Sequence, residues 1–249
     1  NIAGAVVSAA AALMCAQAAS AGTVSYPALG NLELSEGTIE MWIIPQFDPV
    51  DEEDPNSRYW GFNLFEVRQD EDNFINLIWR SQKGRNGPFA RHRQQGFRIP
   101  TNWGVVTGWK KQEPHHIAYC WEGSNDWWVI DGKKTKVASS KYGSLKLHIN
   151  ETIQMVLGSA DVHGTVVIDD LRISSVPRTE EEVGYHQPGK LQADPCTLLL
   201  DTFDDSFDCD GVRQTQPVIM APSVSGQTGG TPDKKCKFVP GVTNTGLRL

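Results

Sequence analysis

The sequence predicts an all-β protein, folded as a packed sandwich of antiparallel strands. Short runs of branched and aromatic residues recur along the chain, and they alternate with turns rich in Gly, Pro, Asn and Asp. The 249 residues include 23 Gly and 14 Pro, enough for many such turns. The clearest stretch, residues 115–137, contains two hairpins back to back. The length suits one large β-domain or two small ones.

This central meander is predicted strand by strand. His116–Trp121 and Trp127–Ile130 are rich in aromatic and branched residues, which favour strands. A polar turn at 122–126 joins them. Asp131-Gly132 predicts a two-residue hairpin turn into a third strand at 133–137, because both residues tolerate positive φ. Both faces of the first two runs are apolar, so we expect the meander inside the sandwich.

The chain carries a net charge of −7 and has a pI of about 5.4. This balance argues against a nucleic-acid backbone or an anionic membrane surface as the main partner. It is compatible with divalent cations, neutral sugars or another protein.

Residues 1–22 are apolar and uncharged. One interpretation is the end of a secretory signal, with a small-residue cleavage neighbourhood at Ala18–Ala21. The other is a retained segment that packs against another subunit. The segment is too short and too interrupted for a membrane span. Both interpretations predict an exported protein, located outside the cell or at its surface.

Five cysteines are present. Cys120 lies among apolar residues within a predicted strand, so we expect a buried free thiol. Cys209–Cys236 is the favoured disulfide, with Cys196 as the competitor for either partner. Such a bridge fits an exported protein. The spacing is not that of a zinc or haem site.

The first predicted strand is Thr38–Ile43, which places Ile39, Met41 and Ile43 on one face. Further strands are predicted at 59–68, 74–79, 89–97, within 145–157 and at 165–173. Asn150-Glu151-Thr152 forms a glycosylation sequon. Thr179 and Glu182 form a capping box that predicts a short helix after the last core strand.

Two groups of residues invite a ligand. Arg91, His92 and Arg93 allow an anion site, although the alternation of 89–97 favours a solvated strand face. His115 and His116 are adjacent, and adjacent strand residues point to opposite faces, so a shared metal ion is not expected. One buried, hydrogen-bonded histidine and one exposed histidine are expected instead.

The loop at 46–57 carries five acidic residues. A solvated loop is the favoured interpretation. The alternative is a calcium-binding loop, because carboxylates are hard oxygen ligands, although the spacing is not that of an EF-hand.

Several short motifs occur in a characteristic order: EGTIEMW at 36–42, HHIA at 115–118, WEG at 121–123, VIDG at 129–132 and IDDLRI at 168–173. Over roughly residues 24–183, this series resembles the laminin-G-like branch of the concanavalin A-like lectin/glucanase superfamily. The resemblance implies a jelly-roll sandwich of two curved antiparallel sheets. It also implies an extracellular binding or adhesion role, sometimes with a calcium ion on the rim. Pro114 departs from the family, which usually has Trp there, and only a local change in packing is expected.

The candidate ligands of a single rim calcium are Asp51, Glu53, Asp54 and Asp169.

Two segments near the end of this chain, Thr197–Phe203 and Phe238–Leu249, resemble the strands with which domains of this family open. Three explanations compete: a fragment of a tandem array, a circular permutation, or strand donation to a neighbouring molecule. An open sheet edge is costly, so some strand must fill it. We favour donation between copies, with Phe238, Val239, Leu247 and Leu249 as assembly residues. The expected parts are a segment at 1–22, a jelly roll at 23–187 and completing strands at 188–249.

Catalysis is not expected. Glucanases of the superfamily resemble one another in a Glu-x-Asp-x-x-Glu strand motif, whose carboxylates line the cleft. That motif does not occur in the sequence, nor does a Ser-His-Asp signature or a phosphate loop.

The sequence therefore predicts a non-catalytic structural or adhesive subunit that assembles with copies of itself. The alternative is a carbohydrate-binding module, which rests on the 8 Trp residues. Trp42, Trp121 and Trp128 are assigned to the core. The candidates for stacking on sugar rings are Trp60, Trp79, Trp103, Trp109 and Trp127.

Overall fold

The computed structural model describes residues 23–48, 60–82, 85–95, 97–99, 102–140, 146–158, 166–186, 190–203, 231–232, 237–240 and 245–248. The described chain is all-β and forms two antiparallel sheets, as the sequence predicts. Its described helical structure is a three-residue 3₁₀ turn, η1 (Gly184–His186). Within the described ranges, no helix has the length and apolar character needed to cross a membrane.

One sheet has seven strands. Their order across the sheet is β14 (Thr231–Pro232), β1 (Thr23–Pro27), β11 (Gln154–Gly158), β3 (Trp60–Arg68), β4 (Phe74–Gln82), β5 (Arg85–Gln94) and β6 (Phe97–Ile99). The other sheet has nine strands. Its order is β10 (Ala138–Ser139), β8 (Asn125–Ile130), β7 (His115–Glu122), β2 (Glu36–Pro45), β12 (Val166–Ser174), β16 (Thr245–Arg248) and β15 (Lys237–Pro240), with β13 (Thr197–Asp201) paired to β12 and β9 (Lys133–Lys134) paired to β8.

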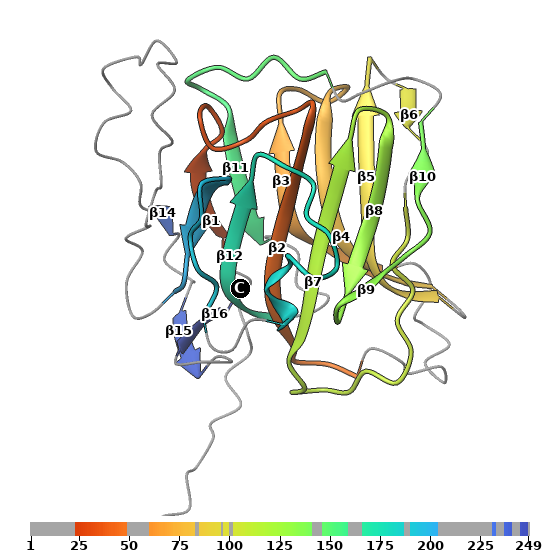
Figure 1. Ribbon diagram of the computed structural model, residues 1–249, viewed down its shortest axis with the longest axis vertical. Helices are drawn as coiled ribbons and strands as arrows, with labels where there is room; N and C mark the ends of the chain where they lie inside the picture. Colours follow the sequence, from red (N-terminus) through yellow and green to blue (C-terminus); the bar gives the residue numbers. More distant parts are fainter. Residues whose placement is uncertain are drawn as a thin grey trace, which may run out of the picture.

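The two sheets form the layers of a sandwich. Figure 1 shows β12, β2, β7 and β8 side by side in front, with β11, β3, β4 and β5 behind them. The core lies between the layers. Ile39, Met41 and Ile43 of β2 enter it from the front sheet, as predicted, and Leu77 and Trp79 of β4 enter it from the rear sheet. Alternate residues of β3, β4 and β5 therefore point away from the core.

The meander has the predicted turns. Gly123 has φ +58° in the β7–β8 turn, and Asp131 and Gly132 have φ +46° and +73° in the β8–β9 turn. Residues 116–121 of β7 are all buried, so both faces of this strand are covered, as expected.

Three predicted elements are shorter than expected. The third strand of the meander is interrupted after Lys133–Lys134, which pairs with Ile130 and Val129 of β8, and it resumes as Ala138–Ser139, which pairs with Asp126 and Asn125 of the same strand. The strand within 145–157 is confined to Gln154–Gly158. The predicted capping box forms its hydrogen bond, with the Thr179 N–H donating to Glu182 Oε2 at 2.9 Å, but the helix is only the η1 turn.

The C-terminal strands close the sheet of their own chain. On the side of β12 away from β2, β13 pairs with residues 171–174 and β16 pairs with Val167 and Ile168. Among the three explanations, this arrangement is the one in which the chain's own C-terminal strands take the place of the missing opening strands. It differs from the favoured expectation, donation between copies, which stays a prediction.

Several predictions lie outside the described residues or side chains. These are the segment 1–22, the acidic residues Asp51, Glu53 and Asp54, the Cys209–Cys236 disulfide, Leu249, and the side chains of Trp60, Phe238, Val239 and Leu247.

Candidate functional site

The outer face of the seven-stranded sheet gathers arginine and aromatic side chains. Residues paired across antiparallel strands share a face, so the register of β3, β4 and β5 defines its rows. One row holds Arg68, Phe74 and Arg93. The next holds Glu66, Asn76 and Arg91, and a third holds Asn63, Ile78 and Phe89. We call this surface the arginine face and define it by Asn63, Glu66, Arg68, Phe74, Asn76, Arg80, Arg85, Phe89, Arg91, Arg93 and Trp103.

A polar network fixes the β3 side of the arginine face. The Asn76 amide donates to Asn63 Oδ1 at 2.8 Å and to Glu66 Oε2 at 2.9 Å. Arg68 donates a fork of two hydrogen bonds to the Glu66 carboxylate, at 2.8 and 2.9 Å. The hydrogen bond to Glu66 raises the pKa of the Arg68 guanidinium. This geometry holds planar donors and acceptors in place before any ligand arrives.

Two rings on the arginine face are each flanked by two guanidinium groups. Arg68 and Arg91 lie over Phe74, at 4.2 and 5.1 Å from the ring centroid. Arg80 and Arg85 lie 5.3 and 5.8 Å from the centroid of Trp103. These distances are typical of cation–π contacts, which hold the guanidinium planes in a preferred position.

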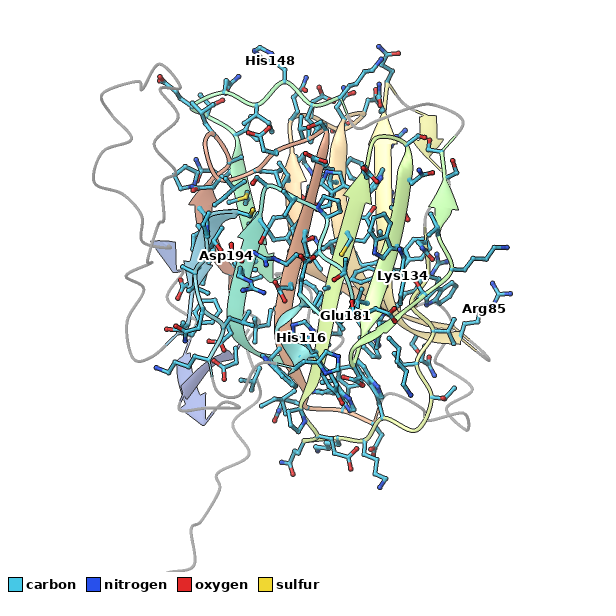
Figure 2. All side chains as sticks on the ribbon, in the orientation of Figure 1. Arg85, His116, Lys134, His148, Glu181 and Asp194 are labelled. Atoms are coloured by element: carbon cyan, nitrogen blue, oxygen red, sulfur yellow. The ribbon has the colours of Figure 1, made fainter. Side chains whose placement is uncertain are left out.

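Trp103 belongs to this surface although it lies outside the three strands. Its backbone forms an isolated bridge to Phe89 of β5, and the two rings meet edge to face at 5.4 Å. Trp103 is half-buried. Arg85 at the start of β5 is exposed and points away from the sandwich (Figure 2).

The other Trp candidates have different positions. Trp79 is 0% exposed, and Trp109 and Trp127 are 6% and 7% exposed. The expectation that these three stack on sugar rings is wrong, because each ring is covered by the protein itself. Trp109 lies flat on His115 at 3.8 Å, and Lys134 covers Trp127 at 4.1 Å.

Of the three tryptophans assigned to the core, two are buried and one is not. Trp121 and Trp128 are buried, as predicted. Trp42 is only half-buried and stacks on Tyr185 at 6.0 Å on the outer face of the nine-stranded sheet, so its assignment to the core is wrong.

The Arg91-His92-Arg93 run is divided between the faces of β5. Arg91 and Arg93 lie on the arginine face, whereas His92 points into the sandwich and is 3% exposed. There its Nε2 lies 2.8 Å from the Tyr119 hydroxyl. Burial lowers the pKa of His92 to about 4, so it is neutral at pH 7. An anion site on this strand therefore excludes His92.

A second polar cluster lies on the outer face of the nine-stranded sheet. Glu40 Oε1 accepts a hydrogen bond from Arg172 at 2.6 Å. Glu40 Oε2 accepts a hydrogen bond from the Gly184 N–H at 2.7 Å and lies 3.1 Å from His116 Nε2. Burial alone would raise the pKa of Glu40. The hydrogen bond and charge of His116, with those of Arg172, lower it to about 2.

This cluster is enclosed by the chain after β12, which crosses in front of β2 in Figure 1. Arg172 also donates to the Gln192 carbonyl at 2.8 Å, and Arg178 pairs with Asp194 at 2.7 Å. Glu40 and His116 are both 0% exposed. We therefore assign the cluster to holding the covering segment on the sheet, because no substrate can reach its carboxylate.

The predicted pair of histidines divides as expected between two faces. His116 joins the buried cluster, and His115 stacks on Trp109 on the other side of β7. His115 Nδ1 lies 2.9 Å from Asp131 Oδ2. His115 exposes only 13% of its side chain and His116 exposes none, so the expectation that one of the two histidines is exposed is wrong.

The candidate metal and sulfur groups are also placed in part. Asp169 is 0% exposed in the middle of β12, opposite Trp42, so it does not lie on an open rim. In the described ranges, no three His, Cys, Asp or Glu side chains form a group that could hold a metal ion. Cys120 is a buried free thiol, as predicted, and burial raises its pKa to about 12. Cys196 is half-buried and free.

Sequence reasoning missed both polar clusters. The arginine face has a partial signal, because Arg91 and Arg93 are two residues apart and so share a strand face. The pairing of Glu40 with Arg172 has no local signal, because the two residues are separated by 132 positions.

Comparisons with known proteins show a shared fold. No family model matches the chain, and no curated protein matches it. The enzymatically active domain of bacteriophage CBA120 tailspike protein 2 is similar, with a TM-score of 0.51 and 13% identity over 74% of this chain. The full-length tailspike protein 2 from an Escherichia coli O157:H7 bacteriophage gives a TM-score of 0.50 and 15% identity, also over 74%.

The match spans 28% and 25% of those two tailspike chains. Domain 4 of the extracellular arabinanase AbnA from Geobacillus stearothermophilus, in complex with arabinotriose, gives a TM-score of 0.44 and 17% identity, over 61% of this chain and 66% of that domain. At these identities the two tailspike structures show the sandwich fold alone.

Proposed function

We propose that the protein is a non-catalytic, exported binding module of the laminin-G-like type, which holds glycan on its arginine face. One observation carries the proposal. The outer face of the seven-stranded sheet holds fixed polar groups together with guanidinium planes that lie over aromatic rings. Sugar recognition needs directed hydrogen bonds to hydroxyl groups and flat surfaces for ring faces. The Asn63–Asn76–Glu66 network supports the first, and the guanidinium plane of Arg80, which lies over Phe89 and Trp103, supports the second.

The experiment is binding of fluorescently labelled protein to an array of neutral and acidic glycans. We expect binding to a subset of the array, and the bound glycans remain intact on prolonged incubation. The Phe89→Ala/Trp103→Ala variant should bind about tenfold or more weakly, because the rings that position the arginines are gone.

Tyr185→Ala is the matched control. Tyr185 is an exposed aromatic residue on the outer face of the other sheet, and its removal should leave binding unchanged. Thermal unfolding shows whether each variant is folded. A folded protein that binds no glycan contradicts the proposal, and so does equal binding by both variants.

Calcium remains a prediction. A rim ion held by Asp51, Glu53 and Asp54 would raise the melting temperature by binding the folded state alone. We expect a higher melting temperature in millimolar Ca²⁺ than in chelator, and the shift should disappear in the Asp51→Asn/Asp54→Asn variant. A shift that persists in this variant would contradict these ligands.

Self-assembly is the second candidate function, and the pairing of β13 and β16 with β12 identifies the strands that would be exchanged between copies. The short strands β13 and β16 complete the edge of β12, and a short terminal strand can pair in the same register with β12 of another copy. Val167→Cys/Arg248→Cys tests this, because these residues are register partners, close enough for a disulfide. Covalent oligomers after oxidation support donation between copies. A cross-linked monomer contradicts it.

A further inference from the structure

We infer that Asn150 is the acceptor of an N-linked glycan, transferred from a lipid-linked oligosaccharide while the chain is exported. Of the asparagines in the sequence, Asn150 alone stands two residues before a Ser or Thr, in Asn150-Glu151-Thr152. Because the middle residue is not Pro, this triplet has the acceptor pattern. The inference rests on the export of the chain in the proposed function, and not on glycan binding by the arginine face.

The triplet forms the tip of an exposed turn. Glu151 and Thr152 are exposed, and Asn150 is half-buried. On either side of the triplet, Ile149 packs against the core and Ile153 is buried. The turn is therefore anchored by apolar residues and presents a polar tip to solvent, where a bulky glycan displaces no packed side chain.

The turn lies at one end of the sandwich. The connection that leads into β11 runs over this end (Figure 1), and His148, two residues before Asn150, points away from both sheets (Figure 2). The His148 N–H donates to Gln69 Oε1 at 2.8 Å, which holds the connection on the β3–β4 turn. The pairing of β11 with its neighbours begins only at Gln154, so a glycan on Asn150 interrupts no ladder hydrogen bond of the sheet.

Hydrogen bonds within the turn fix the Asn150 amide. Its Oδ1 accepts a hydrogen bond from the Thr152 N–H at 2.9 Å and another from Thr152 Oγ1 at 2.7 Å. The Ile153 N–H donates to the Asn150 carbonyl at 3.2 Å. Within the described residues, Asn150 Nδ2 has no hydrogen-bond partner and is not enclosed. The amide oxygen is therefore occupied, and the nitrogen that would carry the glycan is free.

This geometry is available before the chain folds. All three hydrogen bonds join residues at most three positions apart, so they form within the local sequence and need no contact from another strand. A transferase at the export membrane thus meets the same turn in the emerging chain as in the folded protein.

The reaction is a glycosyl transfer without oxidation or reduction. The donor class is a polyprenyl-diphosphate-linked oligosaccharide, and the catalyst is an oligosaccharyltransferase of the export membrane. Asn150 Nδ2 forms a bond to C1 of the first sugar, and the bond between C1 and the diphosphate oxygen breaks. The diphosphate leaves with the electron pair of that bond, and the amide nitrogen loses one proton to a base of the transferase.

The experiment is secretion of the full chain from insect cells behind a cleavable secretory signal, followed by intact-mass measurement. We expect one N-glycan per chain, and a peptide-N-glycosidase should remove it. Asn150→Gln should be secreted without a glycan. The glycosylated and the enzymatically deglycosylated protein should have melting temperatures within about 2 °C of each other, because the glycan lies on an exposed turn.

A pair of variants at Glu151 separates recognition of the triplet from the shape of the turn. Glu151→Pro keeps both Asn150 and Thr152, and Pro suits the second position of a turn closed by the bond between Ile153 and Asn150. This variant should fold and lose the glycan, because Pro is excluded from the middle of the acceptor triplet. Glu151→Ala is the matched control and should keep the glycan.

A secreted wild-type chain of unmodified mass overturns the inference. A glycan that persists in Asn150→Gln or in Glu151→Pro also overturns it. Translation of the chain with microsomes reads the transfer without secretion, and an unmodified chain there is equally contrary. If Asn150 is modified but the glycan array shows no binding, the proposed function is wrong and this inference stands. If the array shows binding but Asn150 is unmodified, only this inference is wrong.

Discussion

At the scale of single residues, two buried carboxyl groups of the sandwich have pKa values shifted in opposite directions. Glu40 lies under the covering segment with Arg172 and His116, and Asp126 lies at the core near Tyr119. A buried charge is tolerated only with partners, because its transfer from water is costly. Glu40 has several partners, and its pKa is lowered to about 2. The pKa of Asp126 is shifted in the opposite direction, because burial raises it to about 7.

The first prediction concerns Glu40. Glu40→Gln removes the charge and leaves the Arg172 and Arg178 guanidinium groups buried without it, so the free energy of unfolding should fall by about 3–5 kcal/mol. Urea denaturation measures this change. Glu122→Gln is the control, because Glu122 is exposed at the end of β7, and its unfolding free energy should change by less than about 0.5 kcal/mol. A loss at Glu40 no larger than that of the control would contradict the buried network.

The second prediction concerns pH. The raised pKa of Asp126 means that the folded state binds the Asp126 proton more tightly than the unfolded state does. The contribution of Asp126 to folding stability is therefore full below about pH 4 and is lost as pH rises through 7. The lowered pKa of His92 has the opposite sign. The contribution of His92 to folding stability is full above about pH 6.5 and is lost as pH falls through 4. The two contributions therefore offset each other between about pH 4 and 6.5.

Variants separate the two contributions. Relative to the wild type, Asp126→Asn should gain stability as pH rises from 4 to 7, and His92→Gln should lose stability over the same range. Urea midpoints measured at several pH values test both slopes. Wild type and variants with parallel pH profiles would show that neither group has a shifted pKa.

At the scale of elements, a bulge in β12 decides which residues meet. Asp169 pairs with Trp42, but after the bulge Arg172 pairs with Glu40, so β12 has one extra residue between these pairs. Because side chains alternate along a strand, the extra residue moves Arg172 onto the outer face beside Glu40. Asp170, inside the bulge, has φ +51°, and its Oδ2 accepts the Leu191 N–H at 2.9 Å.

The third prediction compares two substitutions at Asp170. Asp170→Ala and Asp170→Gly both lose the hydrogen bond to Leu191, which is expected to cost about 1–3 kcal/mol. Only glycine relieves the left-handed backbone, so Asp170→Gly should be more stable than Asp170→Ala by about 1 kcal/mol. Chemical denaturation of both variants gives the difference. An alanine variant as stable as the glycine variant would indicate that the bulge is lost.

At the scale of the whole molecule, the fold depends on strands from the two ends of the chain. In the part of the chain that the structure describes, the front sheet continues beyond β12 through β13, β16 and β15, and the rear sheet pairs β14 with β1. Without these strands β12 would be an open edge with unpaired backbone N–H and C=O groups, which would destabilise the folded state.

The fourth prediction follows from this closure. A chain truncated before Lys237 lacks β15 and β16 and should have a lower melting temperature than the full chain. A peptide with the sequence of residues 237–249 should restore it, because binding to the folded state stabilises that state. A peptide of the same composition in scrambled order is the control. An unchanged melting temperature on truncation would contradict the contribution of these strands to the sheet.

The sequence by itself determined the strands and the sandwich, because local properties specify them. Alternating apolar residues placed Ile39, Met41 and Ile43 in the core, and Asp131-Gly132 set a turn that needs positive φ. Only the tertiary structure decided the sites. The Glu40–Arg172 pair depends on a bulge, and the convergence of Arg80 and Arg85 on Trp103 depends on contacts between β4, β5 and a separate segment. Burial of Trp79 and Trp109 was likewise decided by packing, since a tryptophan suits a core and a sugar site equally well.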